Sequence, residues 1–137
     1  MRDKHLLGIR PELDLKTEES TEIEAFQNKT LRPILKFQNA STTKLLDQAT
    51  HFQKMLDKID GNDPKAFNEI LIKYITSNIV FKNKIIGIVI GLMTETELSF
   101  YLTHASELNK RIVTMQIQRF SDNKNASSNL NHPYLEQ

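Results

Sequence analysis

Cysteine is absent from this chain, which excludes disulfide bonds, thiolate nucleophiles and zinc–thiolate sites. A strong charge of one sign is also missing, because 18 basic side chains nearly cancel 17 acidic ones and leave a net charge of +1. Such a chain has no overall field that would steer it toward nucleic acid or an acidic membrane, so we expect neither as a partner.

Long apolar runs are missing as well. The strongest one, Ile85–Met93, falls far short of the roughly 20 residues that cross a bilayer as a helix. The first eight residues contain no apolar run of signal-peptide length. We therefore expect a cytoplasmic protein with no membrane span, and a single domain, because 137 residues are too few for two separate large cores.

Apolar residues cluster in the middle of the chain, and this divides it into three parts. Residues 1–19 alternate leucine with charged residues after Pro11 and predict a flexible or extended arm. Residues 20–121 contain the amphipathic segments and predict the helical domain. Residues 122–137 are polar and predict a disordered tail.

The helical domain has a clear start at Thr21, because Glu24 follows three residues later in the capping-box pattern. Apolar residues then recur at helical spacing as far as Ile59. Read as one helix, this stretch would be about 60 Å long at about 1.5 Å per residue. Pro33 interrupts it, and we expect a kink or a new start near Lys29, since an interior proline costs about 3 kcal/mol.

Two further helix starts follow. Asp63–Pro64 combines an N-cap with a first-turn proline and predicts a helix to about Ser77. Thr94–Glu97 is a second capping box and predicts a helix reaching about Phe120, with a break near Thr103–Ser106 as the alternative.

The segment between them, Ile79–Met93, is the hardest to assign. Its β-branched residues would suit a buried strand, but no other segment offers a strand partner. We therefore expect a helix that is apolar nearly all round and lies centrally. Gly87 and Gly91 share one face, where a neighbouring helix could approach closely.

These segments predict an all-α fold: a compact bundle of four to five helices with a long first helix, kinked at Pro33 if it is continuous. A long first helix would overhang the rest of the chain and expose an apolar stripe. We therefore expect a homodimer or an unidentified protein partner that covers it. A sharp bend at Pro33 or Ser41 would instead fold the stripe onto the chain itself. The stripe consists of Leu45, Phe52, Leu56 and Ile59.

Catalytic and metal-binding motifs are missing. The chain has no glycine-rich phosphate loop and no Glu-x-x-His pair, and its histidines lie far apart. A surface position is the simpler interpretation of each histidine. We assign no catalytic residue, no metal ligand and no cofactor. The histidines are His5, His51, His104 and His132.

One recurring pattern indicates a binding site. An Asn-Lys pair follows an apolar residue in three separate segments, although asparagine has below-average helix propensity. Three such asparagines near the core, with arginines nearby, could form a network that receives a carboxylate or phosphate. The alternative is that these residues only form solvated helix faces. The candidate anion- or ligand-binding residues are Asn28, Arg32, Asn83, Asn109, Lys110 and Arg111.

Three stretches, Phe26–Lys36, Phe81–Gly91 and Glu107–Arg111, resemble a small helical family of Bacteroidota proteins over about residues 20–120. Members often carry the automatic label "glyoxalase", and the resemblance implies no established activity. The label does not fit these residues. One glyoxalase type needs paired β-rich modules with His and Glu ligands, and the other needs a His-x-His-x-Asp-His cluster. No catalytic residue is carried over.

The sequence therefore favours a non-enzymatic module for protein–protein interaction or self-association. The alternative is a small-molecule or anion binder, or an enzyme, that uses the Asn/Arg cluster. Nucleic-acid binding is a third hypothesis that the sequence disfavours, because acidic residues interrupt the lysines of the first helix and most aromatic residues fall on the predicted core stripe.

Overall fold

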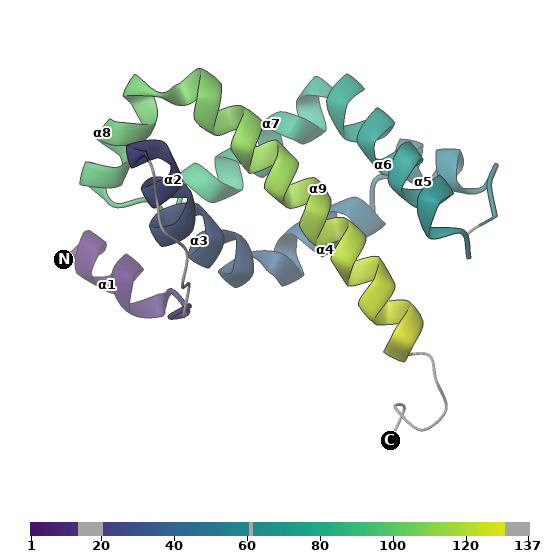
Figure 1. The fold of residues 1–137 in the computed structure, drawn as a ribbon, viewed down its shortest axis with the longest axis horizontal. Helices are drawn as coiled ribbons and strands as arrows, with labels where there is room; N and C mark the ends of the chain where they lie inside the picture. The colour runs from purple at the N-terminus through teal and green to yellow at the C-terminus, as the bar shows by residue number, and fades with distance from the viewer. Residues whose placement is uncertain (14–20, 61, 131–137) are drawn as a thin grey trace.

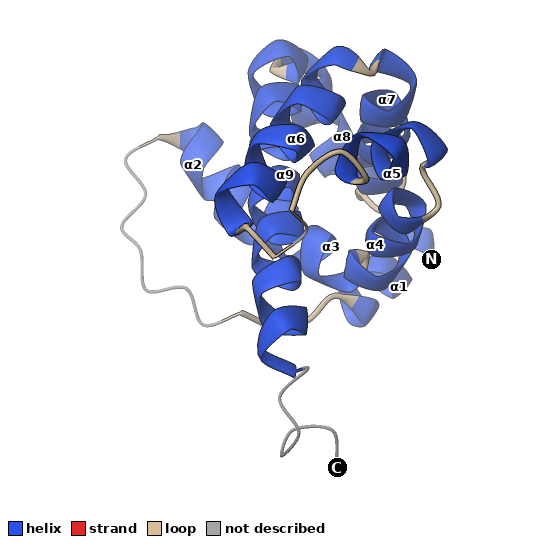
Figure 2. Cartoon of the chain, turned by 90° about the vertical axis from the view of Figure 1, so that its right-hand side faces the viewer, coloured by secondary structure: helices blue, strands red, loops and turns tan. Residues whose placement is uncertain are grey.

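A computed structural model describes residues 1–13, 21–60 and 62–130, with side chains as far as residue 126. Within these ranges the regular structure is helical and contains no strand, so the expected all-α class is confirmed (Figure 1; Figure 2). The helices are shorter and more numerous than the expected four to five. They are α1 (Arg2–Ile9), α2 (Glu22–Phe26), the π turn η1 (Gln27–Leu31), α3 (Arg32–Phe37), α4 (Asn39–Asp47), α5 (Thr50–Leu56), α6 (Pro64–Ser77), α7 (Ile79–Ile90), α8 (Glu95–Thr103) and α9 (Ala105–Leu130).

The expected long, Pro-kinked first helix is not supported. The first helix of the chain is α1, and the stretch from residue 22 to residue 56 is divided into α2, η1, α3, α4 and α5. Pro33 lies at the start of α3, directly after the π turn, in which the Arg32 N–H bonds to the Gln27 carbonyl five residues earlier. The wider π turn accommodates a residue that lacks an N–H. The helix ends instead at Gln38, and again at Ala49, where ψ is 98°.

The break at Ala49 folds the apolar stripe onto the chain itself. Phe52 of α5 is buried, and its ring contacts Phe67 and Tyr74 of α6 at centroid distances of 6.0 Å and 5.3 Å. Leu45 and Leu56 are partly buried against the same core. Ile59, which follows α5, is also partly buried. The structure therefore removes the reason for expecting a partner on this stripe, and the homodimer stays a prediction without structural support.

The cap that the sequence predicts for α6 forms, and α7 has a cap that the sequence analysis did not single out. The Asp63 carboxylate accepts from the Lys65 N–H, and Asn78 caps α7 by accepting from the Phe81 N–H. Helix α7 confirms that the segment after residue 79 is helical, but one side of its first turn is open. Ile79 and Val80 are 65% and 67% exposed, so α7 is not surrounded as fully as expected.

The core is formed by one face of each of the larger helices. Its members lie four residues apart on α7, and four and then eight residues apart on α9, as a helix that packs along one side requires. The longest helix, α9, crosses the molecule diagonally and packs against α6, α7 and α8 (Figure 1). The most deeply buried apolar side chains are Leu31, Ile34, Leu35, Phe52, Leu71, Ile75, Ile85, Val89, Met93, Leu108 and Ile112.

Two expectations about the chain ends differ from the structure. Residues 2–9 form a helix where an extended or flexible arm was expected, and α9 continues to Leu130 where a disordered tail was expected from residue 122. Asn123 explains part of this continuation, because its side-chain amide donates to Asn39 and Thr43 of α4. The remaining parts of both predictions, residues 14–19 and 131–137, lie outside the described residues.

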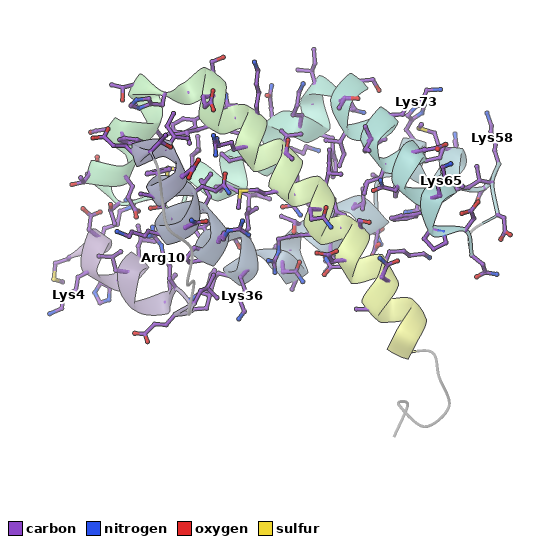
Figure 3. All side chains as sticks on the ribbon, in the orientation of Figure 1. Lys4, Arg10, Lys36, Lys58, Lys65 and Lys73 are labelled. Carbon is purple, nitrogen blue, oxygen red and sulfur yellow. The ribbon has the colours of Figure 1, made fainter. Side chains whose placement is uncertain are left out.

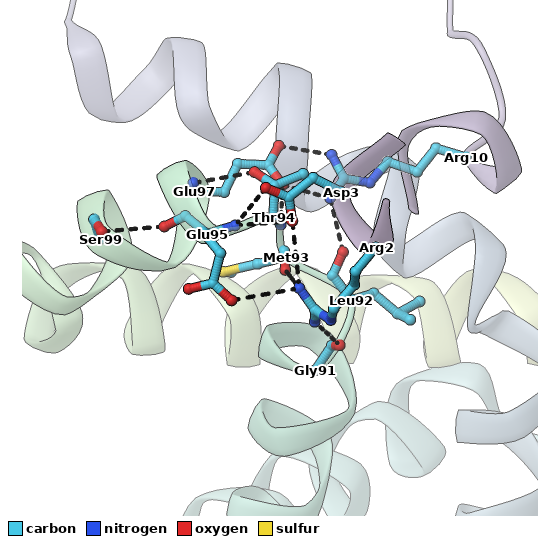
Figure 4. Close-up of polar contacts among 10 residues, drawn as sticks. All are labelled: Arg2, Asp3, Arg10, Gly91, Leu92, Met93, Thr94, Glu95, Glu97 and Ser99. Atoms are coloured by element: carbon cyan, nitrogen blue, oxygen red, sulfur yellow. Dashed lines mark hydrogen bonds and ion pairs between the residues drawn. The ribbon is translucent and has the colours of Figure 1, made fainter. Parts of the chain in front are cut away.

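Polar contacts, rather than apolar burial, hold α1 in place, since none of its residues is buried. The Arg2 guanidinium donates to the carbonyls of Gly91 and Met93, at the C-terminal end of α7 (Figure 4). Asp3 accepts from the backbone N–H of Glu95 in the first turn of α8. A cation therefore meets a helix C-terminus and an anion meets a helix N-terminus, as the helix dipoles favour.

Arg10 provides the second anchor of the N-terminal segment. Its guanidinium donates to both carboxylate oxygens of Glu97 and to the Leu92 carbonyl (Figure 4). Glu97 also accepts from the Thr30 hydroxyl and the Thr94 N–H, and so completes the capping box of α8. The ion pair thus joins three segments that lie far apart in the sequence.

None of the helices in the described part of the chain is long and apolar enough to cross a bilayer.

Candidate functional site

The candidate site lies where η1 and α3 run beside α9. The Arg111 guanidinium of α9 donates to the Gln27 side chain at 2.8 Å, and Asn123 donates to Asn39 at 2.9 Å. Both pairs are 84 residues apart in the sequence, so the two stretches lie side by side and run in the same direction. Side chains from both stretches face the space between them.

This space is a groove with a volume of about 880 Å³. One wall is formed by η1 and α3, the other by α9, and Leu13 lies at its edge. Five basic and two acidic side chains line it, which gives the groove a net charge of +3. The whole chain carries only +1, so all remaining residues together carry a net charge of −2. The lining residues are Leu13, Gln27, Arg32, Leu35, Lys36, Glu107, Lys110, Arg111, Thr114, Met115, Gln118, Arg119 and Asp122.

Arg119 is the least satisfied of these cations. Its Nε atom is buried and has no hydrogen-bonding partner among the residues that the structure describes. Burial lowers the pKa of Arg119 most; the negative charge of Asp122 raises it, and the positive charge of Arg32 lowers it further. Arg119 is therefore partly desolvated and repelled by the charge of the exposed Arg32, and an anion placed between the two guanidinium groups would stabilise both.

The other cations of the groove differ in whether another side chain compensates their charge. Arg111 donates to Glu107 at 3.1 Å in a half-exposed ion pair, which contributes little stability. Arg32 donates through Nε to the Asn28 side chain, a neutral partner that leaves its charge uncompensated. Lys36 and Lys110 are exposed and form no ion pair with any described residue.

The structure brings together three of the residues singled out in the sequence. Arg32, Lys110 and Arg111 all line the groove, although they come from two helices on opposite sides of it. Asn28 is buried beside Arg32 and orients its guanidinium, and it lines a smaller neighbouring cavity of about 510 Å³. The arginine part of the expected cluster therefore converges on one space.

The other two asparagines are not part of this site. Asn83 lies exposed on α7 and lines neither cavity. Asn109 accepts from the Tyr101 hydroxyl at 2.5 Å, so its amide links α8 to α9. The expected network of three asparagines does not form, because the recurring Asn-Lys pattern falls on different helix faces.

Two contributors to the groove were missed in the sequence, Lys36 and Arg119. Lys36 follows Arg32 by four residues, the spacing that places two side chains on one helix face. Arg119 follows Arg111 by eight residues on α9, about two helical turns. Both spacings are visible in the sequence, but only the tertiary fold shows that the two helices turn these faces toward each other.

Metal binding has no visible basis in the described part of the chain, where no three His, Asp or Glu side chains gather as a cluster. No protein-family model, no curated protein and no solved structure matches the chain.

Proposed function

We propose that the protein binds an anionic ligand in the groove between α3 and α9. The observation that carries this proposal is the juxtaposition of Arg32 and Arg119, whose positive charges act on each other at the groove. Neither arginine forms an ion pair with a described residue, and the charge of Asp122 offsets that of Arg119 only in part. An anion between them would relieve both the repulsion and the desolvation of Arg119.

The dimensions of the groove support the binding of a small molecule. Its volume of about 880 Å³ lies within the roughly 300–1,000 Å³ that is typical of ligand pockets. Met115 contributes apolar surface, and Gln27 and Gln118 contribute amides. Such a lining recognises charge and shape, and we therefore propose binding rather than a chemical transformation as the function.

A local excess of positive charge supports the same proposal from electrostatics. The groove carries +3 against −2 for all other residues, so the field is concentrated in a concave surface rather than spread over the molecule. A concave surface of one sign raises the local concentration of counter-ions. Because salt screens such charges over about 8 Å at physiological ionic strength, binding should weaken as salt is added.

Citrate is a suitable first probe, because it carries several carboxylates in a compact molecule. In an amide-detected NMR titration of the full chain at low ionic strength, we expect shifts confined to residues around 32–36 and 110–119. Arg119→Gln should weaken binding roughly tenfold, since a hydrogen bond to a charged group contributes about 1.5–3 kcal/mol.

Lys36→Gln and Lys65→Gln form a matched pair for this titration. Both change the net charge by the same amount at exposed positions, but Lys36 lines the groove, whereas Lys65 lies on α6, well to the right of Lys36 in Figure 3, and does not line it. Only Lys36→Gln should weaken citrate binding. Shifts that spread over the whole surface, or equal losses in the two variants, would show a nonspecific charge effect and contradict the proposal.

A further inference from the structure

A second cavity, which we call the side cavity, adjoins the groove. It has a volume of about 510 Å³ and lies between the N-terminal segment from Leu7 to Leu13 and the segment from Asn28 to Pro33. Leu13 lines both the groove and the side cavity, so the two spaces meet at this side chain.

The two spaces also meet along η1 and α3. Gln27 and Arg32 line the groove. Asn28 and Pro33, which directly follow them in the sequence, line the side cavity. The Nε atom of Arg32 donates to the Asn28 side chain at 2.9 Å, so this arginine of the groove is held against a residue of the side cavity. A ligand bound to Arg32 therefore lies next to the side cavity.

The groove and the side cavity differ in charge. The residues that line the groove carry a net charge of +3. In the side cavity, Glu12 and Lys29 carry opposite charges, and Arg10 is compensated by its largely buried ion pair with Glu97. The side cavity therefore has no net charge once this ion pair is counted, and an anion has no electrostatic reason to enter it.

Apolar side chains of the side cavity remain accessible to solvent. Leu7 of α1 is 56% exposed, and Pro11 and Leu13 are half-buried. Polar contacts hold α1 in place, so its position does not require these side chains to be covered. Because removing apolar surface from water is favourable, an apolar group that fills the side cavity would be bound there.

We propose that the ligand of the groove is an amphiphile with a single acidic head and an unbranched apolar tail, as in a fatty acid. The head lies between Arg32 and Arg119, and the tail passes Leu13 into the side cavity. A charged space beside an apolar one of no net charge matches the two parts of such a molecule. This inference rests on the proposed anion-binding function and specifies the class of ligand.

Straight-chain carboxylates that share one head and differ in tail length test this geometry. In calorimetric titrations of the full chain at low ionic strength, with the ligands below micelle-forming concentrations, affinity should rise from acetate through hexanoate to decanoate. Each methylene that enters the side cavity should contribute roughly threefold. Sebacate, which ends the chain of decanoate in a second carboxylate, should bind more weakly than decanoate, because that charge would lose its hydration in the side cavity. Decanol, which has the tail without the charge, should bind roughly tenfold more weakly than decanoate.

Leu7→Ser and Leu102→Ser form a matched pair for the tail. Both replace an exposed leucine on a helix surface, at 56% and 65% exposure, but only Leu7 lines the side cavity. Leu7→Ser should weaken decanoate binding roughly fivefold and leave acetate binding unchanged, whereas Leu102→Ser should change neither. Arg119→Gln should weaken acetate and decanoate by the same factor, because it acts on the head that they share.

The outcomes distinguish this inference from the proposed function. Equal affinity for acetate and decanoate would overturn the amphiphile and leave the anion site standing. Equal affinity for decanol and decanoate, or equal losses of decanoate binding in Leu7→Ser and Leu102→Ser, would also overturn it. A failure of citrate and of every carboxylate to bind would remove the anion site itself.

Discussion

Both terminal nitrogens of the Arg10 guanidinium donate to the carboxylate of Glu97, at 2.6 Å and 2.5 Å, although the two residues are 87 positions apart in the sequence. The two side chains are only 7% and 17% exposed, so this ion pair is largely removed from water. A bidentate arginine–carboxylate pair fixes orientation as well as distance. It therefore determines how the N-terminal segment sits on α8.

Breaking this pair from one side should be costly. Arg10→Met or Glu97→Gln alone should each lower the free energy of unfolding by about 3 kcal/mol, because each leaves a mostly buried charged group without its partner. The double variant should lose clearly less than the sum of the two, since neither charge is then stranded. Urea unfolding of the four proteins gives this cycle. Strictly additive losses would show that the two side chains do not act as a pair.

The same pair makes stability depend on pH. Burial alone raises the pKa of Glu97, but hydrogen bonds from Arg10, Thr94 and Thr30, together with the charge of Arg10, lower it below its ordinary value of 4.5. The unfolded chain therefore takes up a proton at this group before the folded chain does. The stabilisation is complete above the ordinary value and is lost as the pH falls toward the lowered pKa.

Glu97→Gln is the control for this pH dependence, because it has no proton to take up. The difference in unfolding free energy between the natural chain and Glu97→Gln should be constant near neutral pH and should shrink below the ordinary pKa of 4.5. Urea midpoints measured across this range give the difference. A gap that stays the same at all pH values would contradict the lowered pKa.

Gln116 places a polar amide in the apolar core, where it lowers the stability of the fold. It is 1% exposed on the core-facing side of α9, and neither atom of its amide has a hydrogen-bonding partner among the described residues. Gln116→Met keeps the size of the side chain and should raise the free energy of unfolding by about 1–3 kcal/mol.

Gln118→Met provides the matched control on the same helix. Gln118 is exposed and donates to Asp122 at 2.9 Å, so its replacement should be neutral or slightly destabilising. The denaturant midpoint compares both variants. No gain in Gln116→Met would mean that the buried amide is satisfied in solution.

The two glycines of the α7 region should respond differently to alanine. A Cβ at Gly87 meets nothing within 4 Å, whereas one at Gly91 lies 3.1 Å from the Gly87 carbonyl oxygen. None of the described neighbouring helices comes within 4 Å of the Cβ at Gly87, so the close approach that the sequence suggested for this face is not seen there. Gly87→Ala should therefore stabilise the chain by about 0.5–1 kcal/mol, and Gly91→Ala should gain less. Melting temperatures in the reverse order would contradict this view of the helix.

Local signals in the sequence predicted the helix starts well. The capping residues Thr21, Asp63 and Thr94 each accept the backbone N–H that their positions require. These contacts lie within three residues of each other in the chain, so they depend little on the rest of the fold. The helical state of the segment after Ile79 followed from the absence of a strand partner.

Contacts between distant segments could not be predicted in this way. Nothing near Arg2 or Arg10 in the sequence identifies carbonyls and a carboxylate more than 80 residues later, so the N-terminal helix was missed. For the same reason, the sequence identified only part of the candidate site. Arg32 and Arg111 were recognised as local clusters, but Arg119 becomes important only because α9 runs beside α3.

A crystal structure of the full chain grown with citrate tests the central claim most directly. We expect an ordered citrate in the groove, with a carboxylate between the guanidinium groups of Arg32 and Arg119. The same crystals of Arg119→Gln should show no citrate there. A groove without citrate in the natural chain, or citrate bound only at lysines outside the groove, would contradict the claim.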